Sequence, residues 1–243
     1  MSYIPDESIA VTLDVDWAPD WMIDEIAAIL IDNHVKTTWF VTHESTAIDR
    51  LRKMPELFEL GIHPNLLPES TQGETVDEVM KYLKSIVPEA ISMRTHSLYQ
   101  NTQFLIKAAT NYNIKIDVSL FLPGSHYLTP HIFKYEGVNL YRLPYFWEDD
   151  FEMFQNEPKW KFSDAKYNGP GLKIFNFHPT FIILNTPQIG LYKKLKETFP
   201  LAQWTPDFVK EFRSESEGPK DLFMDLVSLL QGGGYWVKEL ALI

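Results

Sequence analysis

The sequence contains no cysteine. Disulfide bonds, thiolate metal sites and cysteine nucleophiles are therefore excluded. Any chemistry must come from carboxylate, imidazole and hydroxyl groups, and any metal must be bound through nitrogen and oxygen ligands. The chain also has no glycine-rich phosphate-binding loop, so the sequence implies no nucleotide cofactor.

Basic residues are scarce relative to acidic ones. The chain has 22 Lys and Arg against 33 Asp and Glu, a formal net charge of −11 at pH 7. Such a surface repels phosphate backbones and anionic lipid headgroups, so neither nucleic acid nor a membrane surface is expected as a partner. No apolar run is long enough for membrane insertion. Residues 1–7 lack the basic region of a secretory signal, which predicts a cytoplasmic location.

Strand-length apolar runs alternate with helix-length amphipathic runs along most of the chain, which is 45% hydrophobic. Strands are expected over 8–14 and 36–42, in a short run ending at 63, and over 91–94, 114–119, 139–143 and 172–177. Helices are expected near 20–33, 45–58, 76–86, 102–112, 187–198 and 221–231, with long loops over 123–171.

This alternation indicates an α/β fold. The absence of a Gly/Ser linker and of any shift in composition favours a closed (β/α) barrel forming a single domain over residues 1–243. An open, doubly wound sheet is the alternative.

Polar side chains follow the predicted strands at their carboxyl ends, which form the active face of a (β/α) barrel. The first strand ends in Asp14-Val15-Asp16, and the period of two places both carboxylates on the same side. Later strands end in His63, in Arg94 and His96, in Asp117 with Ser119, and in His178. Each residue alone also fits an ordinary role, such as a helix cap or a hydrogen-bonded histidine. Their shared placement indicates a functional site.

These motifs resemble, in order, those of the polysaccharide deacetylase superfamily, which comprises carbohydrate esterase family 4 and its relatives. The resemblance covers about residues 9–179 and implies a distorted (β/α)7 barrel. More narrowly, the chain is similar to the branch associated with bacterial surface-polysaccharide, or O-antigen type, biosynthesis. The motifs are Thr12-Leu13-Asp14-Val15-Asp16, Thr37-Thr38-Trp39-Phe40-Val41, Glu59-Leu60-Gly61-Ile62-His63, Arg94, Asp117 with Ser119, and Phe177-His178.

The resemblance also implies roles for these residues. Asp14 would be the general base, and Arg94 would orient it. Asp16 and His63 would bind a metal. His178 would be the general acid, and Asp117, from the fourth motif, could raise its pKa.

One departure from the family pattern affects the metal site. The family usually has a second metal-binding histidine three or four residues after the first, whereas Leu66 and Leu67 stand here. His96 occupies the position of a family proline, and its place at a strand end could bring an imidazole into the site as the replacement ligand. Asn65 is a weaker substitute, and a protein without metal is the alternative.

The resemblance implies a metal-dependent hydrolase of a carbon–nitrogen bond, which removes an acetyl or formyl group from an amino sugar or glycan precursor. The divalent metal would be Zn, with Fe, Co, Ni or Mn as alternatives. Two other functions stay open: a sugar-binding protein with a degenerate barrel, and a hydrolase that needs no metal. The sequence leaves the oligomeric state open.

Three further residues are candidates for contact with a sugar. Trp147 and Glu148 belong to the run 145–150, where aromatic rings next to acids would suit stacking on a sugar and hydrogen bonding to its hydroxyl or amine groups. A solvated acidic loop is an equal alternative for this run. His43 ends the second strand and would lie on the active face.

Overall fold

The computed structural model describes residues 8–241. Its strands form a nine-stranded sheet in the order β6-β7-β5-β4-β3-β2-β1-β9-β8. Neighbouring strands pair in parallel, except that β6 and β7 are antiparallel. The strands are β1 (Ile9–Asp14), β2 (Thr37–Val41), β3 (Phe58–Ile62), β4 (Ser92–Met93), β5 (Ile116–Phe121), β6 (His131–Tyr135), β7 (Val138–Tyr145), β8 (Trp147–Glu148) and β9 (Lys173–Phe177).

The pairings bring the two sides of the sheet together into a barrel. β7 pairs with β5 as far as Tyr145, and after Phe146 the same run continues as β8, which pairs with β9. With β9 beside β1, the ring is β1, β2, β3, β4, β5, the β7–β8 run and β9. The ring is irregular, since β3 and β4 share one register pair, Ile62 with Met93. The α/β class and the distorted seven-stranded barrel expected from the sequence are confirmed.

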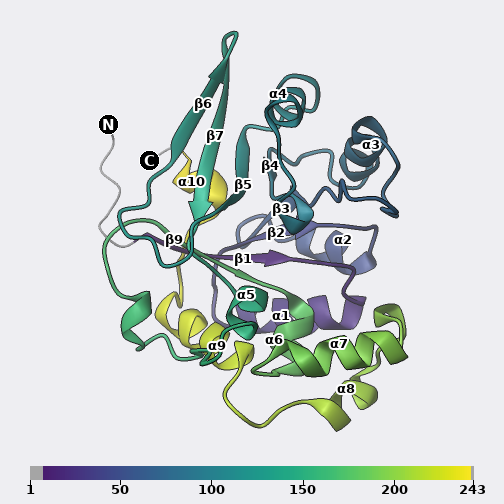
Figure 1. Ribbon diagram of the computed structural model, residues 1–243, viewed down its shortest axis with the longest axis vertical. Helices are drawn as coiled ribbons and strands as arrows, with labels where there is room; N and C mark the ends of the chain where they lie inside the picture. Colours follow the sequence, from purple (N-terminus) through teal and green to yellow (C-terminus); the bar gives the residue numbers. More distant parts are fainter. Residues whose placement is uncertain (1–7, 242–243) are drawn as a thin grey trace.

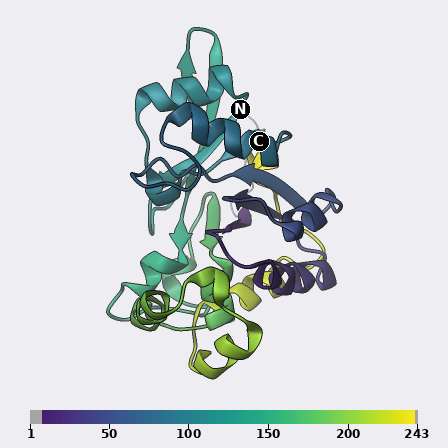
Figure 2. The ribbon, with the colours of Figure 1, turned by 90° about the vertical axis from the view of Figure 1, so that its right-hand side faces the viewer.

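Helices surround the barrel (Figures 1 and 2). The β6–β7 hairpin projects at one end of the molecule, and α6 to α9 gather at the other. No helix within residues 8–241 is long and apolar enough to cross a membrane. The helices are α1 (Asp20–Asp32), α2 (Thr46–Arg52), α3 (Val76–Ile86), α4 (Thr102–Asn111), α5 (Asp149–Met153), α6 (Pro179–Leu184), α7 (Ile189–Thr198), α8 (Pro206–Phe212), α9 (Pro219–Leu229) and α10 (Val237–Leu240), with short 3-10 turns at His96–Leu98, Ala165–Tyr167 and Leu201–Gln203.

Two of the expected elements differ from the structure. The helix expected near 45–58 ends at Arg52, because Pro55 disfavours helical backbone at the residue before it. The region 123–171, expected to be long loops, contains the β6–β7 hairpin, β8 and α5. The tight turn at Glu136-Gly137, with φ of 42° and 82°, makes this hairpin.

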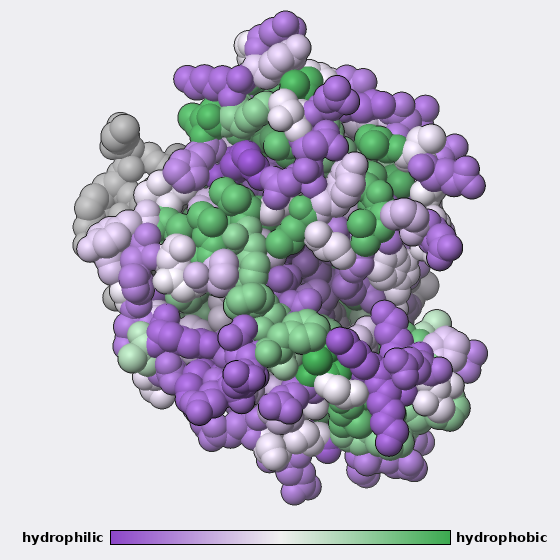
Figure 3. Space-filling model, viewed as in Figure 1, coloured by the Kyte–Doolittle hydropathy of each residue, from purple (hydrophilic) through white to green (hydrophobic). Residues whose placement is uncertain are grey.

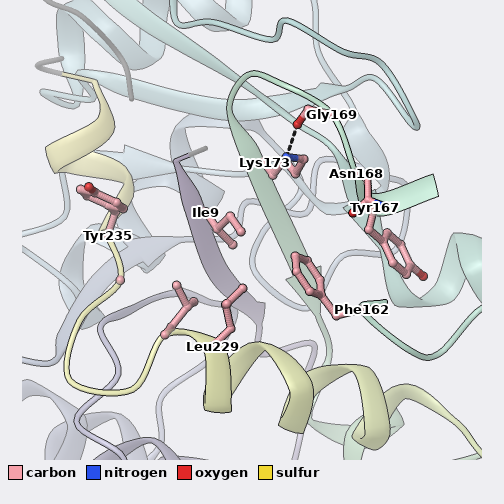
Figure 4. Close-up of a pocket in the computed structure, with 10 residues that line it drawn as sticks. Ile9, Phe162, Tyr167, Asn168, Gly169, Lys173, Leu229 and Tyr235 are labelled. Atoms are coloured by element: carbon pink, nitrogen blue, oxygen red, sulfur yellow. Dashed lines mark hydrogen bonds between the residues drawn. The ribbon is translucent and has the colours of Figure 1, made fainter. Parts of the chain in front are cut away.

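A cavity of about 460 Å³ lies at the amino ends of β1 and β9 (Figure 4). Ile9 of β1, Phe162 and Tyr235 line it, and the Lys173 ammonium donates to the Gly169 carbonyl at its edge. None of the residues singled out in the sequence lies there. The candidate chemistry is at the other end of the strands.

Candidate active site

The site is a cavity of about 290 Å³ at the carboxyl ends of the barrel strands. Figure 3 shows a hollow near the middle of the drawn face. Its interior is hydrophilic, and hydrophobic side chains lie along its border. The cavity is lined by Asp14, Asp16, His63, Thr95, His96, Ser97, Leu98, Phe121, Glu148, Asp150, Phe151, Phe154 and His178. Residues from six strand ends, those of β1, β3, β4, β5, β8 and β9, therefore converge on one small volume.

Three side chains in this cavity form a compact group of metal-ligand type: Asp16, His63 and His96. The Oδ1 atom of Asp16 lies 3.2 Å from Nε2 of His63 and 3.2 Å from Nδ1 of His96. The two imidazole nitrogens are 3.4 Å apart. Four tetrahedral ligands with bonds of about 2.0–2.1 Å would place neighbouring ligand atoms about 3.3–3.4 Å apart. The three atoms are thus spaced as ligands of one divalent ion would be, and these three residues would hold it.

The surrounding backbone brings these ligands together. Asp16 and Trp17 adopt positive φ angles of 42° and 57°, which turn the chain sharply after β1. The backbone N–H of His96 donates to the carbonyl of Pro64 at 2.9 Å, which places the His96 segment beside that of His63. Asn65, the weaker substitute named from the sequence, instead accepts from the Leu67 amide in a turn. Leu66 and Leu67 stand where the resemblance led us to expect a second histidine, and His96 lies beside Asp16 and His63 instead.

The polar environment of the group suits a cation. Nδ1 of His63 donates to the carbonyl oxygen of Arg94 at 2.7 Å, and this hydrogen bond orients the ring so that Nε2 faces Asp16. Burial opposes ionisation of Asp16, but His63 and His96 outweigh it and hold the pKa of this carboxyl well below its usual value. Within residues 8–241, Oδ1 of Asp16 is buried without a hydrogen-bond partner. A cation would satisfy this oxygen.

Asp14 is held beside this group by a buried cation and an amide. It is 2% exposed, and its Oδ1 accepts from Nη1 of Arg94 at 3.0 Å. Its Oδ2 accepts from Nδ2 of Asn176 at 2.9 Å. The sequence reasoning missed Asn176, although an amide between Phe175 and Phe177 in an otherwise apolar strand was the available signal. Asp14 is therefore fixed in position next to the metal-ligand group.

His178 is held by Asp149, which lies at the start of α5. Nδ1 of His178 lies 2.6 Å from Asp149 Oδ1, and the His178 backbone N–H donates to Oδ2 at 2.8 Å. Burial raises the pKa of Asp149 to about 6, against the opposing charge of His178. Burial lowers the pKa of His178, but the carboxylates of Asp149 and Asp16 outweigh burial and raise it well above its usual value. His178 is therefore protonated at neutral pH.

Asp117 does not have the place beside His178 that the sequence suggested. It is fully buried and accepts from Nε of Arg142 at 2.8 Å and from Oγ of Ser119 at 2.6 Å. Ser119 in turn accepts from the backbone N–H of Thr95. The reason is the strand order: β8, which precedes Asp149, is the neighbour of β9, whereas β5 is not. Asp117 instead supports the strand end that carries Arg94.

The three residues named for sugar contact lie in different places. Glu148 lines the cavity and accepts from Asn176 at 3.0 Å and from Tyr145 at 3.1 Å. Trp147 is 4% exposed, and its ring lies 4.9 Å from that of Phe177, so it belongs to the core and not to the cavity. The period of two along a strand requires this, since Glu148 faces the cavity. His43 is not part of the cavity lining. Its Nδ1 forms a hydrogen bond of 2.9 Å with Oγ1 of Thr42, and burial lowers the pKa of the His43 imidazole.

We expect Asp149→Asn to lower the pKa of His178, because the substitution removes the carboxylate that favours the imidazolium. The measurement is an NMR titration of the histidine ring nitrogens in protein treated with a chelator. The imidazolium should persist above pH 7 in the unmodified chain and deprotonate at lower pH in the variant. Glu157→Gln, at a side chain 87% exposed, is the control. An unchanged His178 titration in Asp149→Asn would contradict this assignment.

Comparison with known proteins identifies the family of the chain. The family model of WbmS-like polysaccharide deacetylases matches residues 11–196. A structure from Bordetella bronchiseptica, described as a polysaccharide deacetylase involved in O-antigen biosynthesis, is 28% identical, with a TM-score of 0.79 over 91% of this chain and 90% of that chain. No curated protein matches the chain.

More distant structures are also similar. The Bc1960 peptidoglycan N-acetylglucosamine deacetylase is 13% identical, with a TM-score of 0.47 over 97% of this chain and 89% of that chain. BA3943 of Bacillus anthracis, a CE4 family pseudoenzyme, is 12% identical, with a TM-score of 0.48 over 97% of this chain and 66% of that chain.

The fold and the family match define a protein of the polysaccharide deacetylase class, which is a class of hydrolases. The chain belongs to the WbmS-like polysaccharide deacetylase family. The resemblance inferred from the sequence motifs is confirmed, including its narrower branch.

Proposed function

We propose that this protein is a divalent-metal-dependent hydrolase that removes an acetyl or formyl group from the nitrogen of an amino sugar or glycan precursor. The observation that carries the proposal is the group formed by Asp16, His63 and His96, with its unsatisfied carboxylate oxygen, directly beside Asp14 and His178. Zinc fits the spacing and the nitrogen and oxygen ligands best, with Fe, Co, Ni or Mn as alternatives.

The chemistry divides between the metal and the side chains. A divalent ion held by Asp16, His63 and His96 would polarise the acyl oxygen and lower the pKa of a water molecule. Asp14 accepts the proton of the attacking water, and Arg94 and Asn176 hold its carboxylate in place.

His178 supplies the proton that the departing amine needs. Its protonated Nε2, 3.6 Å from Asp16, donates to the nitrogen of the amide as the carbon–nitrogen bond breaks. Asp149 keeps the imidazole charged until that step. The products are the free amine and a carboxylate, with one water consumed.

The biological setting is proposed by similarity. The Bordetella bronchiseptica structure is described as acting in O-antigen biosynthesis, and we infer a role in surface-polysaccharide biosynthesis for this chain as well. The cytoplasmic location expected from the sequence stays a prediction, as does zinc as the physiological metal.

The test is the metal content of the gently purified protein, measured by elemental mass spectrometry. We expect about one equivalent of metal in the unmodified chain and its loss in Asp16→Ala, His63→Ala and His96→Ala, since each variant removes one of three ligands. His43→Ala, at a histidine outside the cavity lining, is the matched control and should retain the metal. Thermal melting with and without added zinc gives a second readout.

Absence of bound metal would contradict the proposal. A chain that binds no metal after reconstitution with Zn, Fe, Co, Ni or Mn rules out the metal-dependent mechanism. Acyl release without metal would then indicate a metal-free hydrolase, and sugar binding without release would indicate a binding protein.

A further inference from the structure

The two imidazoles of the metal-ligand group are held in different ways. His63 is oriented through its second ring nitrogen, since Nδ1 donates to the carbonyl of Arg94 while Nε2 faces Asp16. A hydrogen bond on the nitrogen away from the metal is the usual means of orienting a ligand histidine. His96 faces Asp16 with Nδ1, and its Nε2 makes no hydrogen bond within residues 8–241. A contact of another kind has to orient the His96 ring.

The ring of Trp17 makes such a contact with His96. The two ring centres lie 5.4 Å apart, and the ring planes are nearly perpendicular at 85°. This T-shaped arrangement is one of the two that aromatic rings prefer, so it favours a particular orientation of the imidazole. The side chain of His96 is 24% exposed, against 2% for that of His63. Because His96 has less surrounding protein, the Trp17 contact is a larger share of its support.

Trp17 is itself fixed by the turn that follows β1. Its backbone N–H donates to Oγ1 of Thr42, the residue after β2, at 3.1 Å. Its φ of 57° lies in the left-handed region, which glycine adopts readily and bulky residues adopt rarely. A large side chain kept in such a conformation beside a functional group suggests a role for that side chain. One turn thus carries the ligand Asp16 and, directly after it, the ring that contacts the ligand His96.

From these observations we propose that Trp17 is the positioning residue of His96. Its ring holds the imidazole with Nδ1 toward Asp16 and His63, in place of the hydrogen bond that orients His63. Trp17 does not line the cavity, so it acts through His96 and not on the substrate. The inference rests on the proposed function, since it assigns a support to the metal-ligand group of that site.

The first test follows the motion of the His96 ring in protein treated with a chelator. The measurement is carbon NMR relaxation of the histidine ring C–H groups. In Trp17→Ala the His96 ring should become more mobile, because it loses its aromatic contact. The His63 ring should keep its order, since the carbonyl of Arg94 still holds it. Trp17→Phe keeps an aromatic ring at this position and should restore most of the order of His96.

The second test measures the affinity for zinc by competition with a chelator. Trp17→Ala should bind zinc about 10–100-fold more weakly than the unmodified chain, as is typical when the group that orients a ligand histidine is removed. Trp17→Phe should recover most of this loss. Trp17→Gly separates the ring from the backbone, because glycine adopts the left-handed turn without difficulty. We expect it to bind zinc as weakly as Trp17→Ala does.

A second aromatic residue provides the matched control. Tyr127 also has a left-handed backbone, with φ of 59°, but its side chain is 77% exposed and lies outside the cavity lining. Tyr127→Ala should change neither the order of the His96 ring nor the affinity for zinc. The inference is overturned if Trp17→Ala leaves either quantity unchanged. It is also overturned if Trp17→Gly binds zinc as tightly as the unmodified chain, since the turn alone would then be responsible.

Failure of this inference is distinguishable from failure of the proposed function. An unmodified chain that binds no metal refutes the metal-dependent function, while the mobility of the His96 ring, measured without metal, still decides whether Trp17 holds it. Zinc binding that is unchanged in Trp17→Ala refutes the role of Trp17 and leaves the hydrolase proposal in place.

Discussion

Asp14→Asn should lower the turnover of acyl release by roughly 10²–10⁴-fold while substrate affinity stays nearly unchanged. The amide has nearly the shape of the carboxylate and can still accept from Arg94, but it cannot take a proton from water. The measurement is the release of acetate or formate from N-acylated amino sugars, with kcat and KM determined separately. The loss of activity should appear as a lower kcat with little change in KM, because the proton transfer occurs in the transition state.

Two controls make this result specific. Glu157→Gln removes an acid that is 87% exposed and should retain full activity. Circular dichroism and thermal melting of Asp14→Asn should show a folded barrel. A folded Asp14→Asn protein with the activity of the unmodified chain would show that Asp14 is not the base.

Arg94→Met should lower the free energy of unfolding by about 3–5 kcal/mol, because it leaves a buried carboxylate without its cation. Arg94 is fully buried, and its guanidinium lies 4.7 Å from the ring centre of Phe40 and 4.4 Å from that of Tyr145. Its Nη1 donates to Asp14, and its Nε donates to the carbonyl of Val118 at 3.1 Å. The measurement is urea denaturation followed by circular dichroism.

A double variant tests the pairing itself. If the loss in Arg94→Met comes from the unpaired charge of Asp14, then Arg94→Met combined with Asp14→Asn should lose less stability than the sum of the two single variants. Additive losses would show that the two side chains do not depend on each other. Arg94→Lys keeps the charge but not the planar fork of donors, and we expect it to fold with reduced activity.

Much of the site was predictable because parallel strands in a barrel share one active face. The period of two placed Asp14 and Asp16 on the same side, and the ends of later strands supplied His63, Arg94, His96 and His178 at that face. The structure brings the three predicted ligands to within hydrogen-bond distance of one another. Whether they bind metal stays a prediction.

The partners of these residues were less predictable. The partner of His178 is Asp149 and not Asp117, and the partner of Asp14 is Asn176. Both pairings depend on which strand ends are adjacent across the barrel. Local periodicity gives the side of a strand on which a residue lies, but not the neighbour that the closed sheet gives it. Trp147 could have been placed by alternation with Glu148, had the short strand β8 been recognised in a region expected to be loop.

The sequence by itself determined the fold class, the family and the ionisable groups that reach the cavity, because hydrophobic periodicity and the order of motifs are local properties of the chain. Only the tertiary structure decided how these groups are paired and which side chains form the walls of the cavity. That decision rests on the continuous β7–β8 run, which joins β5 to β9 and brings α5 next to His178. Closure of the barrel sets these contacts between residues far apart in sequence.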